Sequence, residues 1–327
     1  MHEEALASDD SLESLYVKTK AIIKKGSKSF SLGSLFFNRE TRLGAYLLYS
    51  FCRYCDDQVD DVDHRDDLSL EEKIKLKREK VRELREKTLA LYRGETASEI
   101  AFVSFGKLIE IYRIPSHYPL ELIEGMAMDI EKIHYETLED LELYCYRVAS
   151  VVGLMMCHIM GVSDSKALQF ASEMGMAMQM TNISRDFEED ARMGRLYVPR
   201  QWIKQAGLSD PESLVEVRNR VLAHRLMSRL VEEAALRYYS GRAGLSYLPL
   251  RASLAISIAS FVYEAIGWLV VRRGEKAWDR RPVVSKLGKL VEIIRGFGVW
   301  LWHLPLRLIH PWKRKRSLPL YRFRSFR

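Results

Sequence analysis

The chain contains few of the residues that mark turns, linkers and disulfide frameworks. Its 327 residues include 9 prolines and 18 glycines, which argues against collagen-like, linker-rich and many-stranded β proteins. Four cysteines are too few for a disulfide framework and are consistent with a reducing cytosol. The first ten residues are acidic and polar and lack the apolar segment of a secretory signal. We therefore expect a cytoplasmic globular protein.

The excess of positive charge is confined to the C-terminal end. The formal net charge is +7, and residues 303–327 alone carry eight Lys/Arg and no acidic residue. The other residues hold 43 Lys/Arg against 44 Asp/Glu, so the composition does not support nucleic-acid binding. We expect a domain over residues 1–302 and a basic, aromatic tail over 303–327. Basic side chains favour anionic lipid, so the tail suggests peripheral membrane attachment, with a solvated tail as the alternative.

Apolar residues recur at helical spacing along most of the chain, with no hairpin signal, interdomain linker or fixed repeat. The most apolar stretch, 252–271, is short for a membrane span and contains Glu264, so we interpret it as a buried helix. Residues 70–92 alternate basic and acidic side chains, which predicts an exposed helix. The sequence therefore predicts one all-α domain, with further helices near residues 97–112, 119–131, 139–160, 164–192, 212–239, 250–273 and 284–302.

A first acidic cluster lies within one of the apolar helical stretches. Five of the eight residues from 56 to 63 are aspartate, although aspartate is a poor helix former and like charges one turn apart repel each other. Asp56 and Asp60 are one turn apart and therefore share a helix face. Short carboxylates on a rigid helix are suitable ligands for Mg²⁺, which prefers oxygen and keeps several waters.

A second cluster repeats this chemistry later in the chain. Asn182, Asp186 and Asp190 recur every four residues, so their oxygens line one stripe of a helix that is otherwise largely apolar. Two such stripes facing each other across a cavity would suit Mg²⁺ ions that bridge to a diphosphate, and apolar walls would hold a hydrocarbon. A solvated helix face is the alternative for either cluster alone. Cys52 and Cys55 have the spacing of half a zinc site, but no second pair accompanies them, and we interpret them as buried thiols.

Several motifs together resemble the squalene and phytoene synthases, a family of head-to-head prenyl transferases. The resemblance extends over roughly residues 20–290 and is strongest to the bacterial phytoene synthases, especially at 52–61 and 278–281. The motifs that carry it are Ser27-Lys28-Ser29-Phe30, residues 49–61, Tyr144 to Gly153, Gln179 to Asp190 and Gly194-Arg195-Leu196-Tyr197-Val198-Pro199.

This resemblance implies an isoprenoid synthase fold, a single helical domain around a central cavity, and a role for each matching residue. The metal ligands would be Asp56 and Asp60 on one wall and Asn182, Asp186 and Asp190 on the other. The substrate would be bound by Ser27, Lys28, Ser29, Phe30, Arg53, Gln179, Asn182 and Arg280. The reaction centre would be lined by Tyr49, Tyr144 and Tyr263. Gly26 departs from the family at a position where some relatives carry histidine.

The implied reaction condenses two geranylgeranyl diphosphates into phytoene through a cyclopropylcarbinyl diphosphate. It needs Mg²⁺, with Mn²⁺ as an alternative, and no NADPH is expected because no glycine-rich nucleotide loop is present. Squalene or dehydrosqualene synthesis from farnesyl diphosphate is the nearest alternative, and the small Ser34 favours the longer substrate. A non-catalytic membrane or assembly relative is a further alternative. Residues 56–60 read as the DDxxD motif of chain elongases and cyclases, but the second cluster does not match those enzymes.

Overall fold

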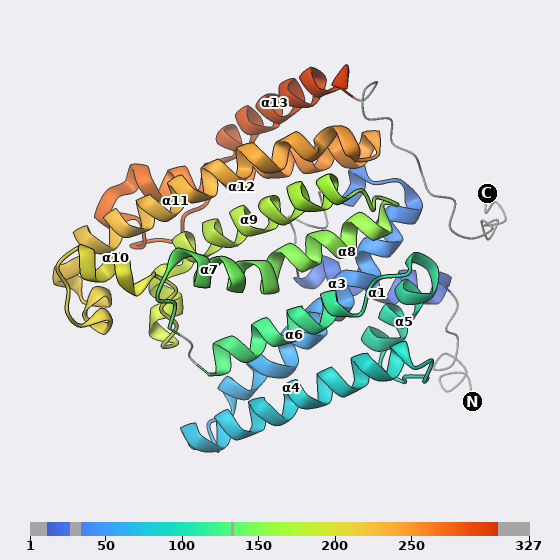
Figure 1. Cartoon of the computed structure of the whole chain (residues 1–327), viewed down its shortest axis with the longest axis horizontal. Coiled ribbons are helices and arrows are strands. Elements are labelled where there is room, and N and C mark those ends of the chain that lie inside the picture. Colours follow the sequence, from blue (N-terminus) through green and yellow to red (C-terminus); the bar gives the residue numbers. More distant parts are fainter. Residues whose placement is uncertain (1–11, 27–33, 132–133, 307–327) are drawn as a thin grey trace.

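The computed structural model describes residues 12–26, 34–131 and 134–306, and these residues form helices, turns and loops without a β-strand. The long helices pack side by side in a bundle (Figure 1). The predicted all-α fold is therefore confirmed. In chain order the α-helices are α1 (Leu12–Gly26), α3 (Arg39–Asp60), α4 (Leu70–Tyr92), α5 (Ile100–Tyr112), α6 (His117–Ile130), α7 (Leu138–Cys145), α8 (Val151–Ile159), α9 (Ser165–Arg192), α10 (Arg200–Gln205), α11 (Arg220–Ala243), α12 (Leu250–Arg273) and α13 (Lys286–His303).

Local sequence accounts for where the helices begin. The Ser69 hydroxyl accepts a hydrogen bond from the Glu72 backbone N–H while the Glu72 carboxylate accepts from the Ser69 N–H, a capping box that starts α4. Asn38 starts α3 by accepting from the Thr41 N–H at 2.8 Å. Asp164 starts α9 by accepting from two backbone N–H groups. These caps place α4 and α9 within one residue of the predicted boundaries.

Two predicted helices differ from those observed. The stretch 139–160 is interrupted by a π-helical turn at 146–150, which separates α7 from α8. The start predicted at residue 212 is wrong, because 3₁₀ turns occupy 211–215 and 217–219 and α11 begins only at Arg220. Pro211 at the first position fits such a turn start. The helix then continues through Gly241, where a Cβ would lie 3.0 Å from the Met174 backbone, so glycine permits the close packing of α11 on α9.

Helix α9 lies inside the bundle and packs against α7, α8, α11 and α12. Its buried residues include Met180, Ile183 and Phe187, which belong to the core shared with α11. The Trp278 indole N–H, from the segment after α12, donates to the Ser184 carbonyl at 3.0 Å. These contacts fix the rotation of α9 about its axis, and so they fix the direction in which its polar stripe points.

Helix α12 is the one helix among the described residues that is long and apolar enough to cross a membrane, judged by length and composition only. It packs against α9, α11 and α13 in the bundle (Figure 1). Its acidic residue, Glu264, is largely buried and pairs with Arg242 of α11. These contacts agree with the interpretation of 252–271 as a core helix.

Candidate active site

The first acidic cluster occupies the C-terminal half of α3. Phe51, Cys55 and Val59 anchor this part of the helix in the core, which leaves Asp56 and Asp60 on a neighbouring face. Burial and, to a smaller extent, the nearby Asp60 carboxylate raise the pKa of the Asp56 carboxyl to about 7, against an opposing effect of Arg53. A positive charge in addition to Arg53 would therefore stabilise the ionised Asp56 carboxylate.

The second cluster occupies the matching part of α9. Burial raises the pKa of the Asp190 carboxyl to about 7, and Asp186 adds to the shift. The Asn182 amide nitrogen donates to the Gln179 side-chain oxygen at 3.3 Å. The Asn182 Oδ1 atom is buried, and none of the described residues donates a hydrogen bond to it. An unpaired buried acceptor is costly in the absence of a ligand, so this oxygen is suited to bind a cation.

The two clusters converge on Asp129, in the last turn of α6. Asp129 interacts electrostatically with Asp56 and Asp60 of α3 and with Asp190 of α9. The Arg195 guanidinium donates to the Asp60 carboxylate at 3.3 Å and opposes the upward shift that burial gives the Asp129 pKa. The described structure thus brings carboxylates from three helices together around one arginine.

Two tyrosines hold the Asp129 carboxylate in place. The hydroxyls of Tyr144 and Tyr197 each donate to a different Asp129 oxygen at 2.9 Å, and the two hydroxyls lie 3.1 Å apart. Their rings stack with centroids 4.9 Å apart. Tyr144, which the resemblance assigns to the reaction centre, is only 3% exposed. Its observed contacts are those of a residue that positions Asp129.

Asp186 is neutralised by arginines in the described structure. Its carboxylate pairs with the neighbouring Arg185, whose Nε lies 2.9 Å from Oδ1, and with Arg281 at 3.2 Å. Arg280, which was predicted to bind the substrate, is exposed, and its carbonyl oxygen accepts a hydrogen bond from Arg273. Of these two neighbouring arginines, Arg281, which is also exposed, is the one whose contact with Asp186 the described structure shows.

Three further predicted site residues, Arg53, Tyr263 and Tyr49, lie on helices that carry or adjoin these clusters. Arg53 pairs with Asp57 at 2.7 Å, and Tyr263 of α12 interacts electrostatically with Arg185. Tyr49 of α3 is half-buried beside the last residue of α1, Gly26, where a Cβ would lie 2.3 Å from the Tyr49 hydroxyl. A histidine at position 26 would therefore require Tyr49 to move, which gives a physical reason for glycine there. Ser27, Lys28, Ser29 and Phe30 lie outside the described residues.

Asp129, Arg195 and Arg281 were not predicted from the sequence to be site residues. A signal for Asp129 is present, because it is the single acid in the last turn of an otherwise apolar segment, 125–130. An acid near a helix C-terminus is electrostatically unfavourable, so its presence indicates a partner outside the helix. Arg195 and Arg281 stand in quoted motifs, but only the folded chain shows which carboxylates they contact.

The donor set fits a hard divalent cation better than zinc. Asp56, Asp60, Asp186, Asp190 and the unpaired Asn182 oxygen would offer the oxygen ligands that Mg²⁺ prefers. Among the described residues, no group of three His, Cys, Asp or Glu side chains is already close enough to hold an ion. Cys55 is buried, and burial raises the pKa of its thiol well above the ordinary value. A neutral buried thiol is a poor zinc ligand, which agrees with the interpretation of Cys55 as a buried thiol, whereas Cys52 is only partly buried.

The raised pKa values predict how the metal-free protein responds to pH. Folding raises the pKa of Asp56 and Asp190 to about 7, so from about pH 4 to 7 the folded state binds more protons than the unfolded state, and stability falls as pH rises. Asp56→Asn removes one such group. Its melting temperature is expected to exceed that of the wild type by on the order of 5 °C at pH 8, and by less at pH 5.

Differential scanning calorimetry in EDTA at the two pH values measures this difference. Asp61→Asn is the matched control, because Asp61 is exposed at the end of the same helix, and its effect should be small at both pH values. If Asp56→Asn raised the melting temperature equally at pH 5 and pH 8, folding would not destabilise the ionised Asp56 carboxylate.

The fold and the site together define a class of enzyme. An all-α bundle that brings two aspartate-bearing helices together, with arginine and tyrosine side chains between them, is the arrangement of the isoprenoid synthases. Residues 23–288 match the squalene/phytoene synthase family. The chain belongs to this family, and it is a prenyltransferase.

Individual relatives agree with this assignment. The chain is 38% identical over 305 residues to the 15-cis-phytoene synthase of Pantoea ananas, covering 91% of this chain and 96% of that protein. It is 39% identical over 275 residues to the phytoene synthase of Pseudescherichia vulneris, covering 84% of this chain and 88% of that protein. Both relatives match nearly their whole length, so the similarity extends through the acidic helices.

Solved structures show the same fold. A dehydrosqualene synthase in complex with a ligand superposes with a TM-score of 0.76 at 24% identity, covering 88% of this chain and 96% of that one. Squalene synthase HpnC from Alicyclobacillus acidocaldarius superposes with a TM-score of 0.70 at 26% identity, covering 80% and 95%. The isoprenoid synthase fold predicted from the sequence is thereby confirmed.

Proposed function

We propose that this chain condenses two geranylgeranyl diphosphates head to head into phytoene, in carotenoid biosynthesis. The observation that carries the proposal is the identity of 38% over 91% of the chain to a 15-cis-phytoene synthase. It is supported by the convergence of α3, α6 and α9 carboxylates around Arg195. A protein that kept only the fold would have no reason to retain these mutually repelling carboxylates.

Enzymes of this family and fold use prenyl diphosphates and typically a divalent metal. We propose Asp56 and Asp60 as ligands on α3 and Asn182, Asp186 and Asp190 as ligands on α9, with Mg²⁺ as the metal and Mn²⁺ as an alternative. Bound Mg²⁺ would supply positive charge that stabilises the departing diphosphate. The unpaired Asn182 oxygen and the raised pKa values of Asp56 and Asp190 support this assignment.

The chain's own residues then divide the remaining tasks. Arg53, Arg195 and Arg281 lie beside the aspartates and can bind diphosphate oxygens, since guanidinium groups match phosphate geometry. Asp129, held by Tyr144 and Tyr197, fixes the position of Arg195. Tyr49 and Tyr263 are proposed to face the reacting carbons, where aromatic rings stabilise allylic cations. Gln179 keeps the Asn182 amide oriented, and residues 27–30 are proposed to complete the diphosphate site.

The reaction has two halves. The first substrate loses diphosphate, its C1 alkylates the double bond of the second substrate, and loss of a proton closes the ring to give a cyclopropylcarbinyl diphosphate. A second loss of diphosphate, ring opening and loss of a proton then give the conjugated triene. Because the last step of the reaction is the loss of a proton, no hydride donor such as NADPH is needed.

Squalene or dehydrosqualene synthesis from farnesyl diphosphate is the second candidate function. It is favoured by the likeness to squalene synthase HpnC, whereas the relatives with higher identity are phytoene synthases. Ser34, which favoured the longer substrate from its size, is 1% exposed, and its hydroxyl donates to the Tyr46 hydroxyl at 3.2 Å. Because Ser34 contacts a core tyrosine, its small size says little about the length of the prenyl substrate.

A product assay distinguishes these functions. Purified protein is incubated with Mg²⁺ and either geranylgeranyl or farnesyl diphosphate, with and without NADPH, and hydrocarbons are extracted. We expect a C40 triene from the C20 substrate, unchanged by NADPH and absent in EDTA. A C30 product as the main hydrocarbon would replace the proposed substrate, and a requirement for NADPH would replace the final step.

We also propose that the protein works in the cytoplasm at the surface of a membrane, attached in part by its tail. Eight Lys/Arg without an acidic residue in 303–327 would bind anionic lipid. A C40 hydrocarbon has no stable place in water, so release into a bilayer gives the enzyme a reason to be there. Residues 307–327 lie outside the described residues, and the tail stays a prediction from composition.

A further inference from the structure

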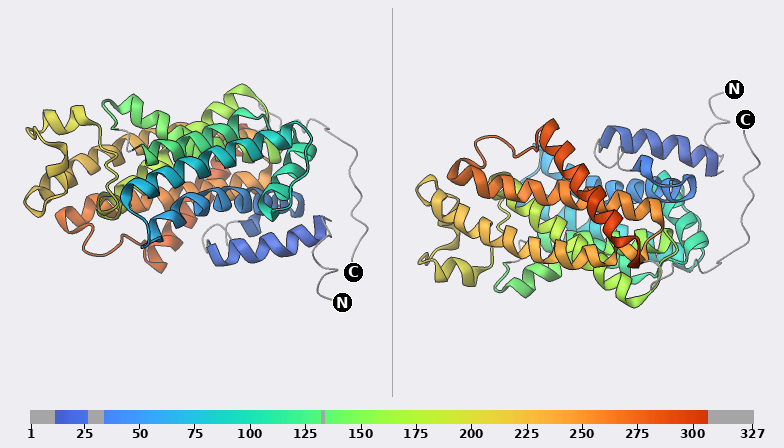
Figure 2. Two further views of the ribbon diagram at one scale, coloured as in Figure 1. Left: turned by 90° about the horizontal axis from the view of Figure 1, so that it is seen from below. Right: turned by 90° about the horizontal axis from the view of Figure 1, so that it is seen from above.

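The outer face of α13 is apolar, although α13 is the outermost helix of the bundle. Figure 1 shows α13 at the edge, and the view from above in Figure 2 shows it lying over α12 with no described element above it. Apart from Ile293, which is 40% exposed, the exposed apolar side chains of α13 follow helical spacing and share one stripe. They are Leu287, Leu290, Val291, Ile294, Phe297, Leu301 and Trp302.

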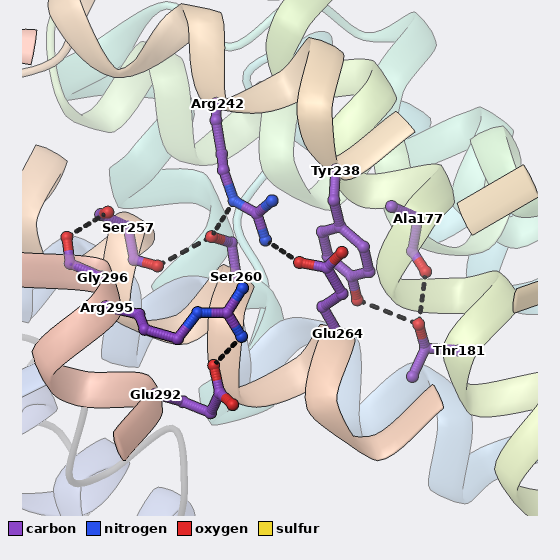
Figure 3. Close-up of polar contacts among 10 residues, drawn as sticks. All are labelled: Ala177, Thr181, Tyr238, Arg242, Ser257, Ser260, Glu264, Glu292, Arg295 and Gly296. Atoms are coloured by element: carbon purple, nitrogen blue, oxygen red, sulfur yellow. Dashed lines mark hydrogen bonds and ion pairs between the residues drawn. The ribbon is translucent and has the colours of Figure 1, made fainter. Parts of the chain in front are cut away.

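The opposite face of α13 contacts α12, and it includes Gly296, the half-buried Val299 and Trp300, whose indole N–H donates to the Leu250 carbonyl at 3.3 Å. The Ser257 hydroxyl donates to the Gly296 carbonyl at 2.7 Å. A Cβ at Gly296 would lie 2.8 Å from the Ile258 Cα, so glycine allows the two helices to touch (Figure 3). Glu292 also lies on this side, with a side chain only 13% exposed.

Charged side chains surround the contact between α13 and α12, and one of them, Arg295, reaches from α13 to α12 (Figure 3). Arg295 pairs with Glu292 at 2.9 Å and lies 5.0 Å from the centre of the Phe261 ring on α12. Arg242 of α11 lies 3.8 Å from the same ring and donates to the Ser260 hydroxyl at 3.0 Å. The Ser257–Gly296 hydrogen bond, the close approach at Gly296 and the Arg295–Phe261 contact hold this face of α13 against α12, and the apolar stripe faces away from α12.

This arrangement is the reverse of that in an ordinary surface helix, whose apolar stripe faces the core. Leu287 is 73% exposed, Ile294 62% and Trp302 79%. Large contiguous apolar patches on soluble proteins mark sites of contact with another apolar body. The charges around the stripe indicate which partner contacts it.

The charges around the stripe favour an anionic lipid surface over a second copy of the chain. Lys286 and Lys289 are exposed on α13, and its only acid, Glu292, is turned inward and paired with Arg295. The basic segment 303–327 follows directly from the end of the helix. Two copies meeting through this face would bring positive charges together, whereas an anionic bilayer would accept both the cations and the apolar side chains.

We propose that the outer face of α13 is a membrane-docking surface that inserts its apolar side chains into the headgroup region of an anionic bilayer. Insertion by α13 and electrostatic attraction by the tail are separate contributions, and stable anchoring takes two such signals. The proposal concerns where the enzyme sits, and it does not depend on which prenyl diphosphate it uses.

The test is sedimentation with vesicles of phosphatidylcholine containing phosphatidylserine, or of phosphatidylcholine alone. The full-length wild type is compared with a face variant, a control variant and a chain ending at His303. The face variant carries Leu287→Gln, Ile294→Gln and Leu301→Gln. The control carries the same change at exposed apolar residues elsewhere, Val17→Gln, Val217→Gln and Leu236→Gln.

We expect the face variant to bind anionic vesicles about 10- to 100-fold more weakly than the wild type, even at high salt. The control variant should bind like the wild type, and the chain ending at His303 should keep the salt-resistant part of the binding. Circular dichroism and turnover of detergent-dispersed substrate verify that each variant is folded. Loss of turnover in every protein, with vesicle binding intact, would count against the proposed function and not against this surface.

Three outcomes would overturn the proposal. The face variant could bind anionic vesicles as the wild type does. The wild type could bind vesicles without anionic lipid equally well. Alternatively, sedimentation equilibrium could show a wild-type dimer that the face variant abolishes, with no vesicle binding by either protein, which would assign the surface to a second copy of the chain.

Discussion

Replacing Asp56 by alanine is expected to abolish turnover, a loss of at least about 1,000-fold, while the fold stays intact. Asp56 lies on the face of α3 that converges with α9, and burial raises its pKa to about 7. Removing this carboxylate decreases charge repulsion in the metal-free protein. The same change removes one of the proposed metal ligands. The same loss is expected for Asp186→Ala on the facing helix.

The measurement is kcat at saturating Mg²⁺, with circular dichroism for folding. Asp61→Ala is the matched control, because it removes one negative charge at the exposed end of the same helix. It should retain activity within about threefold of the wild type. Retained activity in folded Asp56→Ala or Asp186→Ala would contradict the assignment of these residues as metal ligands.

Asp129→Asn is expected to lower kcat by about 10- to 100-fold, the range typical of residues that orient a ligand-binding group. Asp129 interacts with Arg195, which contacts Asp60 at 3.3 Å, and it is held by Tyr144 and Tyr197. Asparagine keeps the size and some hydrogen bonds but removes the charge. We expect the variant to need more Mg²⁺ for half-maximal activity, an effect that a purely structural residue would not have.

The control for this variant is Glu131→Gln, two residues further along the chain. Glu131 is exposed and pairs with Arg78 at 2.6 Å, away from the acidic clusters, so the change should leave kcat and the Mg²⁺ requirement as they are. An Asp129→Asn enzyme with both parameters equal to those of the wild type would remove Asp129 from the site.

The acidic clusters could be predicted because they conflict with local preferences. Five aspartates in eight residues are unfavourable in a helix, and their persistence inside an apolar stretch indicates a role beyond folding. The four-residue spacing of Asn182, Asp186 and Asp190 follows from helical geometry alone. The long helices were predictable for the same reason, since their apolar residues repeat with the helical period.

Contacts between distant segments could not be predicted in this way. Nothing local distinguishes Arg281 from Arg280, yet the turn after α12 brings Arg281 to Asp186 and leaves Arg280 exposed. Helix α11 begins at Arg220 because two 3₁₀ turns precede it, and Pro211 alone does not predict both turns. The apolar stripe of α13 is present in the sequence, but only packing on α12 through Gly296 shows that it faces outward.

The most direct measurement of the central claim is the ratio of diphosphate released to C40 hydrocarbon formed from geranylgeranyl diphosphate with Mg²⁺ and without NADPH. Condensation of two molecules through two losses of diphosphate predicts two diphosphates for each hydrocarbon, and neither product in EDTA. Diphosphate released without any C40 hydrocarbon would show that the site only hydrolyses its substrate, and it would contradict the proposed head-to-head condensation.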